Sequence, residues 1–141
     1  MKDQYNLKRF VAAQELDYKN ALEEVGNGKK TSHWMWYVFP QIEGLGLSST
    51  AQKYAIQSAE ETKAYLKHEI LGPRLLEITN RLLNVNKGSA HTIFGSPDYL
   101  KLKSSMTLFS MYSEENNVFT EILVKYFKNE RCVKTIELLK N

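Results

Sequence analysis

Residues 29–46, KKTSHWMWYVFPQIEGLG, combine aromatic side chains with groups that can donate, accept or transfer a proton. Trp34 and Trp36 offer flat apolar surfaces, and His33 and Gln41 lie close to them in the sequence. Ligand pockets are mostly apolar with a few converging polar groups, and aromatic faces stack on flat ligands such as a base. The stretch therefore predicts one wall of a small-molecule pocket. The alternative is that its aromatic side chains only form core, because each buries a large area.

Two further segments carry groups that can hold an anion. Lys101 and Ser105 lie four residues apart on a predicted helix, so Lys101 can act as a point charge and Ser105 as an aligning donor. The alternative for this serine is a hydrogen bond back to a carbonyl one turn earlier. Arg74 follows a Gly-Pro pair at a predicted helix start, where a guanidinium and free N–H groups can grip a phosphate or carboxylate. The alternative for Arg74 is an ion pair with an acid such as Glu69.

These segments support two functional hypotheses. The first is a pocket for a nucleotide-like or anionic ligand, in which His33 is the best candidate for a general acid or base because its ordinary pKa is near neutrality. The second is a non-catalytic interaction module or homodimer that uses the aromatic stretch as its contact surface. The predicted ligand-binding residues of the first hypothesis are His33, Trp34, Trp36, Gln41, Arg74, Lys101 and Ser105.

Other kinds of site are not predicted. His33, His68 and His91 are scattered without metal-ligand spacing, and there is no P-loop or dinucleotide fingerprint, so we expect neither a metal nor a cofactor. Cys132 is the single cysteine and is expected to pack rather than react. The charge of +3 is spread over lysines interleaved with glutamates, which does not favour nucleic-acid binding. With no apolar membrane segment and a polar start after Met1, we expect a soluble cytoplasmic protein.

The apolar spacing predicts an all-α domain over residues 1–141, a bundle of about seven to nine mostly short helices without a substantial sheet. Its first long helix is expected to run from a cap at Asp3 to Gly26. A helix from Pro97 to about Tyr112 is apolar on every side, which predicts a central, buried position.

Four segments carry a family resemblance in order along most of the chain. They are YNLKRFVAAQ (5–14), KKTSHWMWYVFPQIEGLG (29–46), AQKYAIQSAEETKAYLKHEILGPRL (51–75) and IFGSPDYLKLKSSMTLF (93–109). In these segments the chain resembles a family of small bacterial proteins catalogued as domain of unknown function family 1810. The resemblance implies a compact helical domain and no established activity.

Two other labels bear on this resemblance. Members are sometimes labelled calpastatin, but the segments of that inhibitor are largely disordered, whereas this chain has core-forming helices. More distantly, the chain resembles helical N-glycosidase-type proteins thought to process ADP-ribose derivatives in an aromatic-lined pocket. Those proteins carry a glutamate beside the histidine of their central motif, where this chain has Ser32 and Trp34 flanking His33.

Overall fold

The apolar periodicity of the sequence produces nine α-helices and no strand within residues 3–140, the part of the chain described by the computed structural model. A single isolated bridge between Ile42 and Ile56 is the only β-type pairing in that range. The expectation of an all-α fold with mostly short helices is therefore confirmed. The helices are α1 (Lys8–Gly26), α2 (Met35–Val38), α3 (Ser49–Lys53), α4 (Ala59–Lys67), α5 (Leu71–Leu83), α6 (Ala90–Phe94), α7 (Asp98–Ser110), α8 (Val118–Phe127) and α9 (Val133–Leu139).

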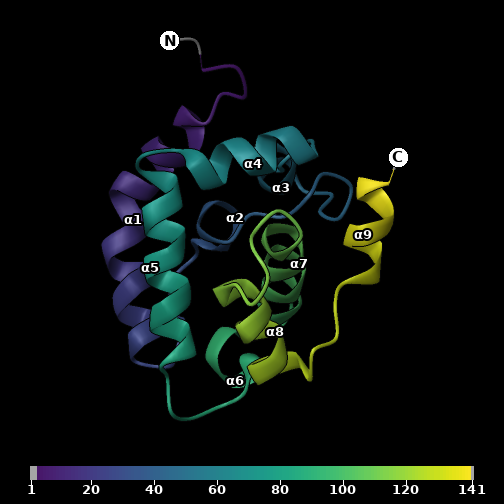
Figure 1. Cartoon of the computed structure of the whole chain (residues 1–141). Coiled ribbons are helices and arrows are strands. Elements are labelled where there is room, and N and C mark those ends of the chain that lie inside the picture. The colour runs from purple at the N-terminus through teal and green to yellow at the C-terminus, as the bar shows by residue number, and fades with distance from the viewer. Residues whose placement is uncertain (1–2, 141) are drawn as a thin grey trace.

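Helix α7 lies at the centre of the arrangement (Figure 1). It contacts α4, α6, α8 and α9, while α1 and α5 lie side by side at the edge and α2 packs on α1. Leu102, Met106, Leu108 and Phe109 of α7 are buried completely. The central position predicted from its all-round apolar character is therefore confirmed, although the helix begins at Asp98 and ends two residues before Tyr112.

The hydroxyl groups of α7 do not all behave alike. Ser104 and Thr107 donate to the carbonyl oxygens of Leu100 and Lys103, one turn earlier, at 3.1 and 2.8 Å. This is the usual arrangement for a buried hydroxyl in a helix. Ser105 is equally buried, yet its Oγ has no hydrogen-bond partner within residues 3–140.

The start of α1 differs from the prediction. Asp3 does accept hydrogen bonds from the N–H groups of Leu7 and Lys8, at 2.7 and 2.9 Å. Between them, however, Asn6 has a left-handed backbone with φ of 53°, so the chain turns before the helix begins at Lys8. The predicted N-cap was wrong, because the residue that precedes the helix is Leu7, although the Asp3 carboxylate still accepts the first N–H groups from the preceding turn.

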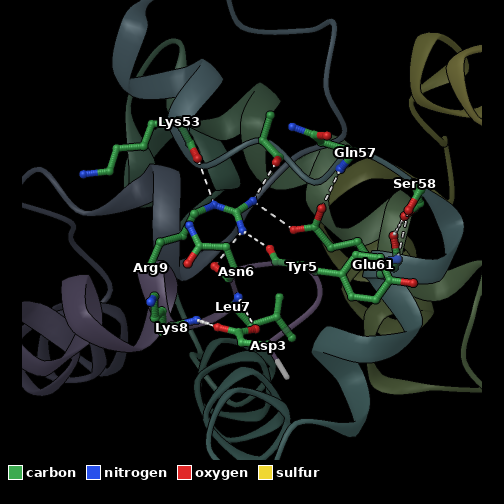
Figure 2. A network of polar contacts seen from close by, with 12 residues as sticks. Asp3, Tyr5, Asn6, Leu7, Lys8, Arg9, Lys53, Gln57, Ser58 and Glu61 are labelled. Carbon is green, nitrogen blue, oxygen red and sulfur yellow. Dashed lines mark hydrogen bonds and ion pairs between the residues drawn. The ribbon is translucent and has the colours of Figure 1, made fainter. Parts of the chain in front are cut away.

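An ion pair whose guanidinium donors are all used joins the first turn of α1 to α4 (Figure 2). Arg9 Nη2 lies 2.9 Å from Glu61 Oε2, and only 11% and 3% of the two side chains are exposed. The other four N–H donors of the guanidinium reach backbone carbonyl oxygens. These are the carbonyls of Tyr5, Asn6, Lys53 and Ala55, at 2.7–2.9 Å. Because a guanidinium has five N–H donors, Arg9 has none left for a ligand.

Candidate functional site

A cleft of about 390 Å³ lies between two segments that are distant in the sequence. One segment is the loop that leads from α1 into α2, and the other runs from the end of α6 into the first turn of α7. Buried Met35 and Phe94 supply apolar lining, and the remaining groups are mostly polar. The lining residues are Lys30, Thr31, Ser32, His33, Met35, Trp36, Phe94, Ser96, Pro97, Asp98 and Lys101.

The carboxylate of Glu24, on the last turns of α1, holds the first of these segments in place. Its Oε1 accepts hydrogen bonds from the N–H groups of Thr31 and Ser32 at 2.7 and 2.9 Å and from the indole Nε1 of Trp34 at 2.9 Å. Burial alone would raise the pKa of Glu24, but hydrogen bonds from Ser32, Thr31 and Trp34 outweigh it and lower the pKa to about 2. The loop is therefore fixed to α1 by an ionised carboxylate.

The two tryptophans have different positions. Trp34 is completely buried and packs edge-on against Phe94, with ring centroids 6.4 Å apart, so it lies beneath the cleft and does not line it. Trp36 is half-buried and lines the cleft. It also lines a second hollow of only about 10 Å³, together with Gln41. Only Trp36 can therefore offer its indole to a ligand in the larger cleft.

Asp98 connects two lysines across the cleft. Its Oδ2 lies 2.8 Å from Lys30 Nζ, and its Oδ1 lies 3.6 Å from Lys101 Nζ. Lys30 is the more enclosed cation, with 7% of its side chain exposed. Its ammonium also donates to the carbonyl of Ser32 at 2.5 Å and lies 4.9 Å from the ring centroid of Trp34. The Asp98 carboxylate and the Ser32 carbonyl thus hold the Lys30 ammonium in place.

Lys101 is the cation with free donors. Its side chain is 23% exposed, and 3.6 Å from Asp98 is too long for a hydrogen bond. Its ammonium lies 5.2 Å from the ring centroid of Trp36, and none of its N–H groups makes a hydrogen bond within residues 3–140. Two ammonium groups and one carboxylate leave one positive charge in the cleft, at its more accessible lysine.

The structure brings some of the predicted site residues together and separates others. His33, Trp36 and Lys101 share the cleft, with His33 exposed. Arg74 lies elsewhere, 3.1 Å from Glu15 and 5.2 Å from the ring centroid of Tyr18, so it has the ion-pair role foreseen as its alternative but with a different acid from Glu69. Trp34, Gln41 and Ser105 also do not line the cleft.

Sequence reasoning missed Lys30 and Asp98 as site residues. Asp98 lies in the first turn of α7, where an acidic side chain is common because it interacts favourably with the helix dipole, so its presence there does not by itself indicate a site. Their pairing depends on a tertiary contact that also includes a backbone bond from Lys30 N–H to the Ile93 carbonyl at 2.7 Å. No spacing rule within one sequence would have joined these two segments.

Metal and membrane features are absent from the described range. In residues 3–140, no three His, Cys, Asp or Glu side chains lie close enough to hold a metal ion. Within the same range, no helix is both long and apolar enough to cross a membrane.

Comparison with known proteins shows which family the chain belongs to. The chain is 47% identical to a protein of solved structure, described as the conserved hypothetical protein Rv1873 from Mycobacterium tuberculosis, and the match covers 99% of each chain with a TM-score of 0.96. A search of curated proteins gave no match. The model of the family described as "Protein of unknown function (DUF1810)" matches residues 4–139. This chain therefore belongs to the DUF1810 family, as its four resembling segments suggested.

Proposed function

We propose that the cleft binds a small anionic ligand that carries a flat ring, such as a nucleotide-like molecule. The observation that carries this proposal is the open ammonium of Lys101, 5.2 Å from the ring centroid of the half-buried Trp36. An anion bound at Lys101 lies beside the indole, so its attached ring can stack there. The cleft volume, about 390 Å³, falls within the range of roughly 300–1,000 Å³ found for ligand sites.

The charge balance of the cleft supports an anion. Asp98 neutralises one of the two lysines, which leaves one net positive charge among partly buried groups. Such a charge is weakly screened by solvent and attracts an anion more strongly than an exposed lysine does. His33 lies at the same cleft and can add a hydrogen bond or transfer a proton.

The interface hypothesis is less well supported. It required that Trp34 or Trp36 be exposed as an anchor for a second protein or a second copy. Trp34 is completely buried with its N–H bound to Glu24, and Trp36 is half-buried against its neighbours. A concave site therefore accounts for the aromatic stretch better than a flat contact surface does.

A second candidate function is catalytic. Hydrolysis of an N-glycosidic bond in ADP-ribose derivatives needs a carboxylate, which the sequence neighbours of His33 lack. Asp98 supplies a carboxylate in the same cleft from a different segment. Its charge could stabilise a cationic sugar carbon while His33 transfers a proton. Release of free base from ADP-ribosylated compounds, abolished by Asp98→Asn, would support this candidate.

The binding proposal is tested by thermal shift and calorimetry with nucleotides, nicotinamide derivatives, sugar phosphates and small carboxylates. Ligand at 100 times its Kd should add about 2.7 kcal/mol to stability. We expect a saturable ligand whose affinity falls at least tenfold in Trp36→Ala and in Lys101→Met.

Lys103→Met is the matched control, because Lys103 is also on α7, is 22% exposed, and pairs with Glu130 outside the cleft. It should bind like the wild type. Equal binding by all four proteins, or no binding across the panel, would contradict the proposal.

A further inference from the structure

We infer that the Asp98–Lys101 pair recognises a hydroxyl group of the ligand, so that the cleft selects hydroxylated anions such as sugar phosphates over anions without hydroxyls. This inference rests on the proposed function and narrows its ligand class. Its basis is the wider of the two oppositely charged pairs in the cleft, Asp98 Oδ1 and Lys101 Nζ, whose separation of 3.6 Å is too long for a hydrogen bond.

Lys101 Nζ and Asp98 Oδ1 both have hydrogen-bonding capacity that the protein does not use, the first as a donor and the second as an acceptor. The Lys101 ammonium can only donate, and it makes no side-chain hydrogen bond within the described residues. Asp98 can only accept when ionised, and its Oδ2 is already bound to Lys30 while Oδ1 has only the distant Lys101. The pair therefore offers a donor and an acceptor side by side.

A single hydroxyl group satisfies both atoms. Its oxygen can lie about 2.8 Å from each, which is compatible with their 3.6 Å separation, and it then accepts from Lys101 and donates to Asp98. A phosphate or carboxylate oxygen without a proton can only accept, so at this point it would face the charge of Asp98. The ligand's anionic group is therefore bound by another N–H of Lys101, away from Asp98 Oδ1, and the hydroxyl takes the position between the two side chains.

The position of Asp98 is fixed before the ligand arrives. Lys30, with 7% of its side chain exposed, holds Oδ2 at 2.8 Å and is itself held by the Ser32 carbonyl. That carbonyl belongs to the loop which Glu24 fixes to α1. A preorganised carboxylate loses little freedom on binding, so its hydrogen bond to the ligand hydroxyl contributes to selectivity.

The test compares two probes by calorimetry on the wild-type protein. Ribose 5-phosphate and tetrahydrofurfuryl phosphate share a five-membered ring and a phosphate, but only the first has hydroxyls on the ring. We expect ribose 5-phosphate to bind at least tenfold more tightly. The preference should be retained in Lys103→Met and fall below threefold in Asp98→Asn, chiefly because the probe without hydroxyls gains affinity when the negative charge is removed.

The outcomes separate this inference from the proposed function. Equal wild-type affinity for the two probes, with both lost in Lys101→Met, would overturn hydroxyl recognition and leave anion binding intact. Binding of neither probe, nor of any anion in the wider panel, would overturn both. The wild-type comparison decides the question even where Asp98→Asn does not fold.

Discussion

The Arg9–Glu61 pair and the Lys101–Asp98 pair are both partly buried contacts between opposite charges, yet they differ in how many donors they use. Every N–H of Arg9 has a partner, and the pair is closed at 2.9 Å. Lys101 and Asp98 remain 3.6 Å apart with capacity unused on both sides. If charge and burial were the only criteria, the Arg9–Glu61 pair would be chosen as the candidate site. The unused hydrogen-bonding groups of Lys101 and Asp98 identify the second pair instead.

The same distinction holds within the cleft itself. Lys30 lies 2.8 Å from Asp98, donates to the Ser32 carbonyl, and has only 7% of its side chain exposed. Glu24 likewise has three donors on one oxygen. These two residues build the cleft, whereas Lys101, Trp36 and His33 are placed to contact what enters it. Four predictions test this division, from the largest expected effect on stability to the smallest.

Removing one partner of the Arg9–Glu61 pair should have the largest effect. In Glu61→Ala the guanidinium of Arg9 stays buried without its carboxylate, and Gln57 N–H loses its acceptor at 3.0 Å. Breaking a buried ion pair on one side typically costs about 3–5 kcal/mol. Urea unfolding would measure this loss. A change below about 1 kcal/mol would mean that this pair does not hold the N-terminal segment.

Glu24→Gln should have the next largest effect. Losing a charged acceptor of three hydrogen bonds is expected to cost about 2–3 kcal/mol at neutral pH. Because the pKa of Glu24 is lowered from 4.5 to about 2 in the folded protein, its stabilisation is complete above pH 4.5 and is lost as the pH falls to 2. The stability difference between wild type and Glu24→Gln should therefore shrink over that range. A constant difference would contradict the role assigned to the carboxylate.

Ser105→Ala should be neutral or stabilise by up to about 1 kcal/mol, since it removes a buried hydroxyl that has no partner. Thr107→Val is the contrast, because Thr107 Oγ1 accepts the N–H of Cys132 at 2.9 Å and its loss should destabilise. Thermal unfolding of both variants would show the opposite signs. A clearly destabilised Ser105→Ala would mean that the hydroxyl has a partner after all, such as a ligand or a water molecule.

Lys101→Met should change stability least, by within about 0.5 kcal/mol, because the side chain of this lysine makes no hydrogen bond within the described residues. The same variant should lose ligand affinity most clearly. Denaturation and calorimetry on one preparation would show whether stability and binding separate in this way. A large loss of stability would place Lys101 with the residues that build the cleft.

Local patterns were enough to predict the helices and the central position of α7, since both depend on apolar spacing along one segment. The aromatic stretch and Lys101 were also identified from residue type alone. The separate roles of Trp34 and Trp36 were not predictable, because they depend on Glu24 at the far end of another helix. The same holds for Arg74, whose acid partner is Glu15 on α1 rather than its sequence neighbour Glu69.

Because the two tryptophans lie in different environments, ligand binding can be followed by the intrinsic fluorescence of the protein. Trp34 is sealed in the interior, so its contact with solvent should stay constant while the fold is intact. Trp36 is half-buried at the cleft with a lysine ammonium near its ring, so an arriving anion changes both its solvent contact and its local field. These are the only tryptophans in the sequence. A shift in intrinsic fluorescence on titration therefore reads occupancy of the cleft directly, without a label.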